Sequence, residues 1–456
     1  MDALLTIVQK INFYLSDYVL IFLLIGTGLY FTIKTNFVQV RCLGEGFKAV
    51  FGKFSLNGGK QEDGMSSFQA LATAIAAQVG TGNLVGACGA ILVGGPGAIF
   101  WMWIIAFFGM ATIYAEAVLA QETRIKDKDG SIQGGPVFYI KKAFPNKLGD
   151  FLAGFFAIAI MLALGFMGLM VQSNSIGASF NTALGIQPWI VGIVVAAVSA
   201  FIFIGGVQRL AAVAEKIVPI MAFLYLLGGV VLLVMRAAYI PETIVMIFKY
   251  AFFPNAIIGG GLGYALKTAI SQGAKRGLFS NEAGMGSTPH AHALANVKKP
   301  HDQGVVAMVG VFVDTFIVLT MTGLVVISTL YAGDGILASG AAEGVDKTNM
   351  VQLAFSMVFG EGIGSLFVAI CLAFFAFSTI LSWHFFGKIN ATHLFGKAGA
   401  KVYAVIAIGF IFLGSCLSND LVWELADMFN QLMVIPNALA LITLGSLVVA
   451  AAKKDD

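Results

Sequence analysis

Long apolar runs separated by short polar connections make up most of the chain. A helix needs about 20 residues to cross the hydrocarbon core of a bilayer, and these runs approach or exceed that length. A short amphipathic helix on the membrane surface, over residues 1–15, is expected before the first run. The predicted membrane-spanning segments are residues 17–34, 66–93, 97–122, 150–178, 188–206, 211–236, 260–296, 303–331, 362–387, 400–417 and 421–451. The pattern predicts an all-α polytopic membrane protein with about 11 transmembrane helices.

Two of these segments contain glycines that interrupt a helix. In the second segment, Gly80 and Gly82 flank the β-branched Thr81, a poor composition for a helix interior. An opened turn in hydrocarbon leaves peptide groups without water, so it persists only where it lines a cavity or binds something. The alternative is close helix packing, because Gly82 and Gly86 have a GxxxG spacing. Residues 276–287, in the seventh segment, have the same glycine-rich character.

The positive residues test the predicted topology, since cytoplasmic loops carry an excess of lysine and arginine. With eleven crossings, 20 of the 27 positive residues fall on one side of the membrane. They are Lys34, Arg41, Lys48, Lys53, Lys60, Arg124, Lys126, Lys128, Lys141, Lys142, Lys147, Arg209, Lys216, Lys298, Lys299, Lys388, Lys397, Lys401, Lys453 and Lys454. This distribution predicts an N-terminus outside the cell and a C-terminus in the cytoplasm.

The order of the segments suggests an internal repeat. Residues 1–65 hold the surface helix, one extra transmembrane helix and a cytoplasmic loop, and ten crossings remain. They divide into two five-helix halves of opposite orientation, 66–236 and 260–451, and the first helix of each half is the interrupted one. Inverted repeats with broken helices near the midplane are typical of secondary transporters. The free N–H groups of a half-helix suit a carboxylate, and the free carbonyls suit a cation or an ammonium group. A zwitterionic amino acid beside a small cation would satisfy both.

Polar side chains within other apolar runs are candidates for the same site. The hydroxyls of Ser378 and Thr379 can complete an oxygen cage for sodium with the carbonyls of Ala76 and Val79. The alternative for these hydroxyls is a hydrogen bond to a carbonyl one turn earlier. Gln172 is a candidate substrate contact, or it makes a hydrogen bond between helices.

Aromatic and ionisable residues near the breaks extend the list of candidates. Phe279 and Trp383 either form walls of a pocket or only pack. Ionisable groups inside a membrane need a partner or water, so each is a functional hypothesis. These groups are Lys267, Lys275, Arg276, Glu282, Asp314 and Glu116. We expect Lys275 and Arg276 to gate an outer vestibule, with Glu282 as a candidate partner, and Glu116 to pair with Arg124. The sequence favours a solvated loop over a metal site for His290 and His292.

Composition and motifs narrow the class of protein. The chain is 58% hydrophobic and 11% charged, against about 25% charged in an average soluble domain. The net charge of +3 does not indicate a nucleic-acid partner, and the four cysteines have no paired spacing that predicts a disulfide or zinc site. We find no sequence motif of an ATPase or a hydrolase, so we do not expect an enzyme. A channel or an amino-acid sensor remains a rival, although no selectivity filter or output domain is recognisable.

Four stretches resemble motifs of one family, the alanine or glycine:cation symporters, also called sodium:alanine symporters. They are residues 79–83, 94–103, 134–136 and 277–287. The resemblance implies a leucine-transporter-like 5+5 inverted repeat with one extra N-terminal helix, in the cytoplasmic membrane. It also implies sodium-coupled uptake of small neutral amino acids, namely alanine, glycine and, in some members, D-alanine. Glutamine or serine transport and proton coupling occur in the wider family, and sodium is co-transported rather than a resident cofactor.

The resemblance also assigns roles to residues. Thr81 and Gly82 would hold the substrate carboxylate, and Phe279 would offer a carbonyl to the amino group. The pocket would be completed by Gln172, Thr379 and Trp383. The main sodium site would consist of Ala76, Val79, Ser378 and Thr379, and Asn83 would serve a second sodium. The family often has a small residue in place of Gln78, so this longer side chain is expected to shift the substrate preference.

Overall fold

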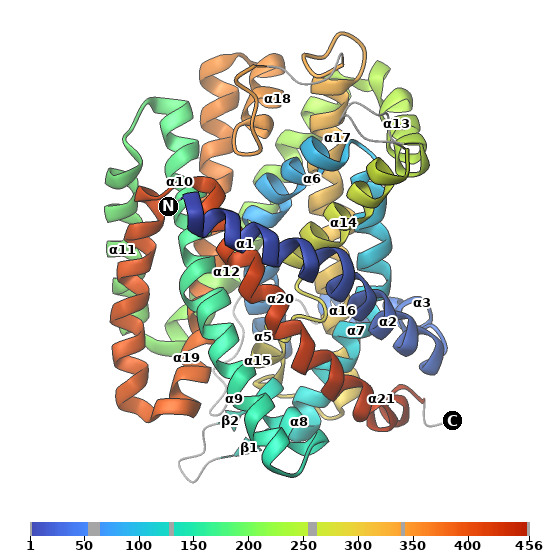
Figure 1. Ribbon diagram of the computed structural model, residues 1–456, viewed down its shortest axis with the longest axis vertical. Helices are drawn as coiled ribbons and strands as arrows, with labels where there is room; N and C mark the ends of the chain where they lie inside the picture. The colour runs from blue at the N-terminus through green and yellow to red at the C-terminus, as the bar shows by residue number, and fades with distance from the viewer. Residues whose placement is uncertain (1, 53–63, 127–131, 254–261, 339–342, 454–456) are drawn as a thin grey trace.

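The computed structural model describes residues 2–52, 64–126, 132–253, 262–338 and 343–453. These residues are almost entirely helical (Figure 1), and the two strands among them, β1 (Ile125–Lys126) and β2 (Ile132–Gln133), form one short antiparallel pair. Some residues used above in the topology argument lie outside the described parts of the chain. They are Lys53, Lys60, Lys128, Lys454 and the first two residues of the segment 260–296.

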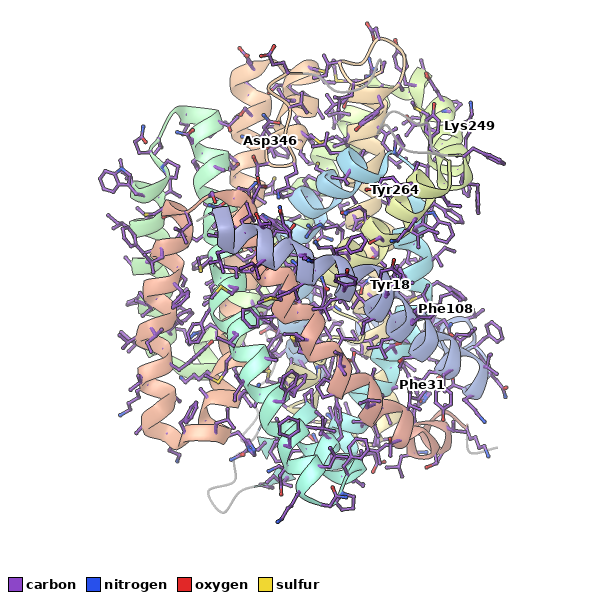
Figure 2. The ribbon with its side chains drawn as sticks, in the orientation of Figure 1. Tyr18, Phe31, Phe108, Lys249, Tyr264 and Asp346 are labelled. Carbon is purple, nitrogen blue, oxygen red and sulfur yellow. The ribbon has the colours of Figure 1, made fainter. Side chains whose placement is uncertain are left out.

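The N-terminal segment forms one long helix. It consists of α1 (Asp2–Tyr14), a π-helical turn η1 (Leu15–Leu20) and α2 (Ile21–Lys34), and the backbone stays helical at both junctions. The helix predicted over residues 1–15 therefore continues into the first span, since no glycine, proline or cap ends it, and its place on the membrane surface stays a prediction. Gly28 lies against Phe108 of the neighbouring α7 (Ala98–Thr123), and Figure 2 labels Phe108 together with Tyr18 and Phe31 of the N-terminal helix.

The next five predicted spans each fall on helices. The second span is α5 (Ser67–Gln78), a π-helical turn η2 (Gly82–Gly86) and α6 (Ala87–Gly94), and it bends by 46° at its break. Ser66 and Gln69 form a capping box that starts α5. The remaining helices are α7, α9 (Lys147–Leu162), η3 (Ala163–Gly168), α10 (Leu169–Leu184), α11 (Pro188–Ile204) and α12 (Gly206–Met235).

The second part of the chain follows a similar order. Helix α14 (Leu262–Asn281) leads into a series of turns over 282–288 and then into the short α15 (Pro289–Ala293). The next long helix is made of α16 (Pro300–Val311), η6 (Phe312–Leu319), α17 (Thr320–Val326) and η7 (Ile327–Tyr331). After α18 (Met350–Phe359), helix α19 (Glu361–Cys416) turns back on itself at Gly396, whose φ of 69° and ψ of −174° are not helical. The last elements are α20 (Asn419–Thr443) and α21 (Gly445–Ala452).

Shorter helices occupy the connections. They are α3 (Val38–Arg41), α4 (Leu43–Phe51), α8 (Pro136–Ala143), η4 (Ala237–Tyr239) and α13 (Ile240–Phe252). The sequence pattern did not predict these helices as separate elements. Figure 1 shows α8 and the β1–β2 pair at the lower end of the molecule, and α13 and α18 at the upper end.

Each of the eleven predicted spans coincides with described helical residues, but length and apolar composition alone support fewer crossings. Seven of the described helices are long and apolar enough, or eight if the bent pair α5 and α6 is one span. Helix α11 is apolar but has only 17 residues, and α19 contains two arms separated at Gly396. The helical membrane fold is thus established, and the count of eleven stays a prediction.

Candidate functional site

The first broken helix opens as predicted, at residues 79–81. In an unbroken helix, the N–H groups of Gly80 and Thr81 would donate to the carbonyls of Ala76 and Ala77. Instead, the Gly80 N–H donates to the side-chain oxygen of Asn83 (2.9 Å), and the Thr81 N–H donates to Oε1 of Gln172 (3.3 Å). The break therefore releases two carbonyls at the end of α5.

Two buried hydroxyl groups of helix α19, on Ser378 and Thr379, lie beside these carbonyls. The Thr379 hydroxyl lies 2.9 Å from the Ala76 carbonyl oxygen, and the Ser378 hydroxyl lies 3.4 Å from the same atom. Both hydroxyls also reach the Phe375 carbonyl one turn earlier, at 3.0 and 2.9 Å. Val79 is buried and has a non-helical ψ of 88°, which turns its carbonyl out of the helix direction. The four residues predicted to bind sodium thus come from the same end of α5 and the facing turn of α19.

The predicted substrate residues also surround this break. A Cβ atom on Gly80 would lie 2.3 Å from the Thr379 hydroxyl oxygen and 3.4 Å from Oε1 of Gln172, so all three residues meet there. A Cβ atom on Gly82 would lie 3.2 Å from the ring of Phe279. Among the described residues, the Thr81 hydroxyl and the Gln172 Nε2 group are buried without a hydrogen-bond partner. Buried polar groups are normally paired, so these two atoms need an explanation.

The second break lies farther along the chain than the sequence suggested. Helix α14 continues through Phe279 to Asn281, and the irregular backbone follows over 282–288. The expectation of a break that includes Phe279 is wrong, because the positive φ angles that end the helix fall on Glu282, Gly284 and Gly286. The carbonyl of Phe279 is still near the helix end. The N–H of Ala283, its usual partner, donates to the Asn281 side chain (3.0 Å).

Aromatic rings surround Phe279, near the end of α14. The Phe279 ring packs edge-to-face on Trp383 (5.6 Å between centroids) and lies 4.8 Å from Trp423. The Trp383 indole N–H donates to a carboxylate oxygen of Glu282 (2.5 Å), and the Ser287 hydroxyl donates to the other oxygen. Sequence reasoning did not find Trp423 or the role of Glu282, because their partners are distant in the sequence.

Two side chains join the first broken helix to its neighbours. Gln78 donates its amide N–H to the carbonyl of Asn281 (2.8 Å), which connects the two breaks directly. Asn83 donates to the Asp314 carboxylate (2.7 Å), which also accepts from Ser280 (3.0 Å). Asp314 therefore has the buried partners that an ionisable group within a membrane needs. The roles of Gln78 in the pocket and of Asn83 at a second sodium stay predictions.

Glu116 holds the second break rather than pairing with Arg124. Its carboxylate accepts from the N–H groups of Gly284 (3.1 Å) and Gly286 (2.8 Å) and from the amide of Asn437 (2.7 Å). The predicted pair with Arg124 is wrong, since eight helical residues separate the two side chains by about 12 Å. Arg124 donates instead to the carbonyl of Ala295 (2.6 Å).

Lys275 and Arg276 on α14 form ion pairs with an acidic residue that the sequence analysis did not identify, Asp427. Asp427 of α20 lies 2.8 Å from Lys275 and 3.1 Å from Arg276, and its side chain is only 2% exposed. The Arg276 guanidinium also lies 4.8 Å from the Trp423 ring. Glu282, the candidate partner named from the sequence, bonds elsewhere. The Trp423 ring contacts both Arg276 and Phe279, and the gating role of Lys275 and Arg276 stays a prediction.

The histidines after the second break are buried, so the expected solvated loop is wrong. His290 lies 2.9 Å from the Asn390 amide, and His292 lies 2.8 Å from the Gln303 amide. Both are at most 1% exposed, because the 282–295 segment runs back between helices.

Lys267 lies 4.7 Å from the Tyr18 ring, near the N-terminal helix.

Comparison with known proteins decides the family. Residues 1–455 match the model described as the sodium:alanine symporter family. The chain belongs to the sodium:alanine symporter family. This match confirms the predicted family and its function class, a sodium-coupled symporter for amino acids.

Several relatives within the sodium:alanine symporter family match along most of their length. The sodium/alanine symporter AgcS of Methanococcus maripaludis is 40% identical, over 98% of this chain and 96% of that protein. The amino-acid carrier protein AlsT of Bacillus subtilis is 36% identical, over 94% and 88%. A protein of Bacillus subtilis called "Probable sodium/glutamine symporter GlnT" is 36% identical, over 98% and 90%.

Two solved structures share the fold of this family member at low sequence identity. The crystal structure of MhsT in complex with L-phenylalanine superposes with a TM-score of 0.61 at 15% identity, covering 87% of this chain and 97% of that one. A substrate-bound, outward-open sodium-coupled sialic acid symporter gives a TM-score of 0.53 at 13% identity, covering 89% and 82%. These superpositions confirm the leucine-transporter type of fold, while the number of helices stays a prediction.

Proposed function

We propose that this protein carries a small neutral amino acid, such as alanine or glycine, together with sodium into the cell. The observation that supports this best is the pair of partnerless polar groups at the first break, the Thr81 hydroxyl and the Gln172 Nε2. The Gln172 Nε2 group is a donor and the Thr81 hydroxyl can be one, and both lie beside the buried N-terminal end of the half-helix that starts at Gly82. A carboxylate is the ligand that such donors prefer.

The substrate carboxylate would bind at Thr81 and Gly82. In the present structure Oε1 of Gln172 accepts the Thr81 N–H, so a carboxylate oxygen would replace it and accept from the Gln172 Nε2 group as well. The ammonium group would bind the carbonyl of Phe279, and the side chain would face Trp383. A small side chain suits this arrangement, since Phe279, Trp383 and Trp423 are all nearly fully buried.

Sodium would bind between α5 and α19. Its oxygen ligands would be the carbonyls of Ala76 and Val79 and the hydroxyls of Ser378 and Thr379. Oxygens 2.3–2.6 Å from a hard cation such as calcium stand roughly 3.4 Å apart when the bonds are at right angles. The Ser378–Ala76 oxygen distance is 3.4 Å, whereas the Thr379–Ala76 distance of 2.9 Å is that of a hydrogen bond and would lengthen around sodium. By tying the break to α19, sodium would favour the conformation that binds substrate, and substrate would favour sodium to the same degree.

We also propose that the two halves, residues 66–236 and 260–451, are inverted repeats that alternate access around this site. Each half contains a broken first helix, then a long helix and a short helix, α8 or α18, before its third long helix. The proposed orientation puts the N-terminus outside and the C-terminus in the cytoplasm of the cell membrane. Figure 1 separates the two sides assigned by the charge count, because α8 and the β1–β2 pair lie at one end and α13 and α18 at the other.

Uptake of labelled alanine into proteoliposomes tests the proposal. We expect uptake with an inward sodium gradient and none when potassium replaces sodium. Competition by glycine, D-alanine, serine and glutamine would then rank the substrates, with glutamine included because of the GlnT relative. Uptake that follows a proton gradient without sodium would overturn the sodium assignment, and inhibition by glutamine alone would overturn the small-substrate assignment.

A further inference from the structure

A groove beside α11 combines basic residues with an apolar wall. Helix α19 folds back at Gly396, and its two arms and the end of α11 enclose a groove of about 570 Å³. Three lysines line it: Lys388 on the first arm of α19, and Lys397 and Lys401 on the second. The last two are four residues apart, so they share one face of their helix. The described residues that line the groove include no carboxylate.

Apart from Thr392, the rest of the groove is apolar, and it is open to the surroundings. Ile204 at the end of α11 is 86% exposed, and Val405 on the second arm is 71% exposed. Phe203 forms the inner wall. In a protein that crosses a bilayer, exposed side chains of this kind face acyl chains rather than water. A ligand that fills the whole groove must therefore carry negative charge at one end and hydrocarbon at the other.

We propose that this groove binds an anionic phospholipid. The phosphate would lie between Lys388 and Lys401, and an acyl chain would run along Ile204 and Val405. Basic pockets between transmembrane helices on the cytoplasmic side are known to suit such headgroups. Figure 1 shows α11 and α19 side by side at one edge of the molecule, with the bend of α19 at the same end as α8. In the proposed orientation this is the cytoplasmic leaflet.

The inner wall of the groove reaches the candidate transport site through two side chains. The Phe203 ring stacks on His384 with 3.5 Å between centroids and an angle of 7° between the planes. His384 directly follows Trp383, whose indole donates to Glu282. A lipid in the groove would thus support the contact of α11 with α19 behind the predicted pocket, whichever amino acid the protein carries.

Native mass spectrometry of the purified full-length protein tests this inference. The protein would be titrated with phosphatidylglycerol and, separately, with phosphatidylcholine of the same acyl chains, and thermal stability would be followed in parallel. The test variant is Lys388→Gln with Lys401→Gln. The matched control is Lys142→Gln with Lys147→Gln, which removes two exposed positive charges on the same predicted side that do not line the groove.

We expect the wild type and the control to bind phosphatidylglycerol more tightly than phosphatidylcholine and to gain Tm with it. The test variant should lose about 30-fold in affinity, or about 2 kcal/mol for two lysines, and lose that gain in Tm. If the double variant does not fold, Lys401→Gln alone, at an exposed position, should lose roughly 5-fold. Equal binding of the two lipids by the wild type, or an equal loss in the control, would overturn the proposal. Neither result depends on sodium-driven uptake.

Discussion

Replacing Thr379 by alanine should separate sodium binding from folding. The hydroxyl is fully buried and lies 2.9 Å from the carbonyl oxygen that the first break releases on Ala76. Its loss removes one neutral hydrogen bond, which costs about 1 kcal/mol of folding free energy. The loss of sodium-binding free energy should be larger, about 1.5–3 kcal/mol, which is the range for hydrogen bonds to charged groups. That range corresponds to a fall in sodium affinity of roughly 10- to 150-fold.

The assay is a sodium titration of alanine uptake in proteoliposomes, with Tm and the amount of reconstituted protein measured in parallel. Thr379→Ser is the matched control, because it keeps the hydroxyl and removes only a methyl group. We expect the serine variant to stay near the wild-type sodium dependence and the alanine variant to need far more sodium. A sodium dependence unchanged in the alanine variant would refute the reasoning. Equal loss in the serine and alanine variants would refute it too, since the hydroxyl would then not matter.

Three further changes test other parts of the site. Asp427→Asn should lower Tm much more than Glu424→Gln, because it removes the acid bound to the buried Arg276 and leaves Lys275 only the more distant Glu424, at 3.9 Å. The expected cost is about 3–5 kcal/mol, and similar shifts in the two variants would contradict this. Glu116→Ala should destabilise the protein by about 3 kcal/mol and Glu116→Gln by less, since alanine leaves the Gly284 and Gly286 N–H groups unpaired. Denaturation of both variants in detergent measures the difference, and equal stability of the two variants would contradict the role of these hydrogen bonds. Gln78→Ala should change the ranking of competing amino acids in the uptake assay, and an unchanged ranking would show that Gln78 only joins the two breaks.

The first break was predictable because its cause is local. Glycine and threonine at positions 80–82 disfavour a helix wherever they stand. The second break was placed too early because the 276–281 stretch has only Gly277 to weaken it, and the helix there survives. The turn begins where Glu282, Gly284 and Gly286 adopt positive φ, which a list of glycines cannot locate to the residue.

Partners of buried charges could not be read from the sequence. Lys275 and Asp427 are neighbours only because α14 and α20 come together in the fold, and no local pattern links them. Closeness along the chain suggests that Arg124 pairs with Glu116, but on a straight helix residues eight positions apart lie about 12 Å from each other. The position of His290 and His292 after the break, near a predicted loop, suggests a solvated site, although the fold buries both side chains.

The central claim is that the opened backbone around Thr81, together with the end of α14, binds a zwitterion beside a sodium ion. An experimental structure of the protein with alanine and sodium tests it most directly. The account predicts the alanine carboxylate at the N–H groups of Thr81 and Gly82, its amino group at the Phe279 carbonyl, and a cation between Ala76 and Thr379. A continuous helix through residues 79–81, or alanine bound away from both breaks, would contradict it.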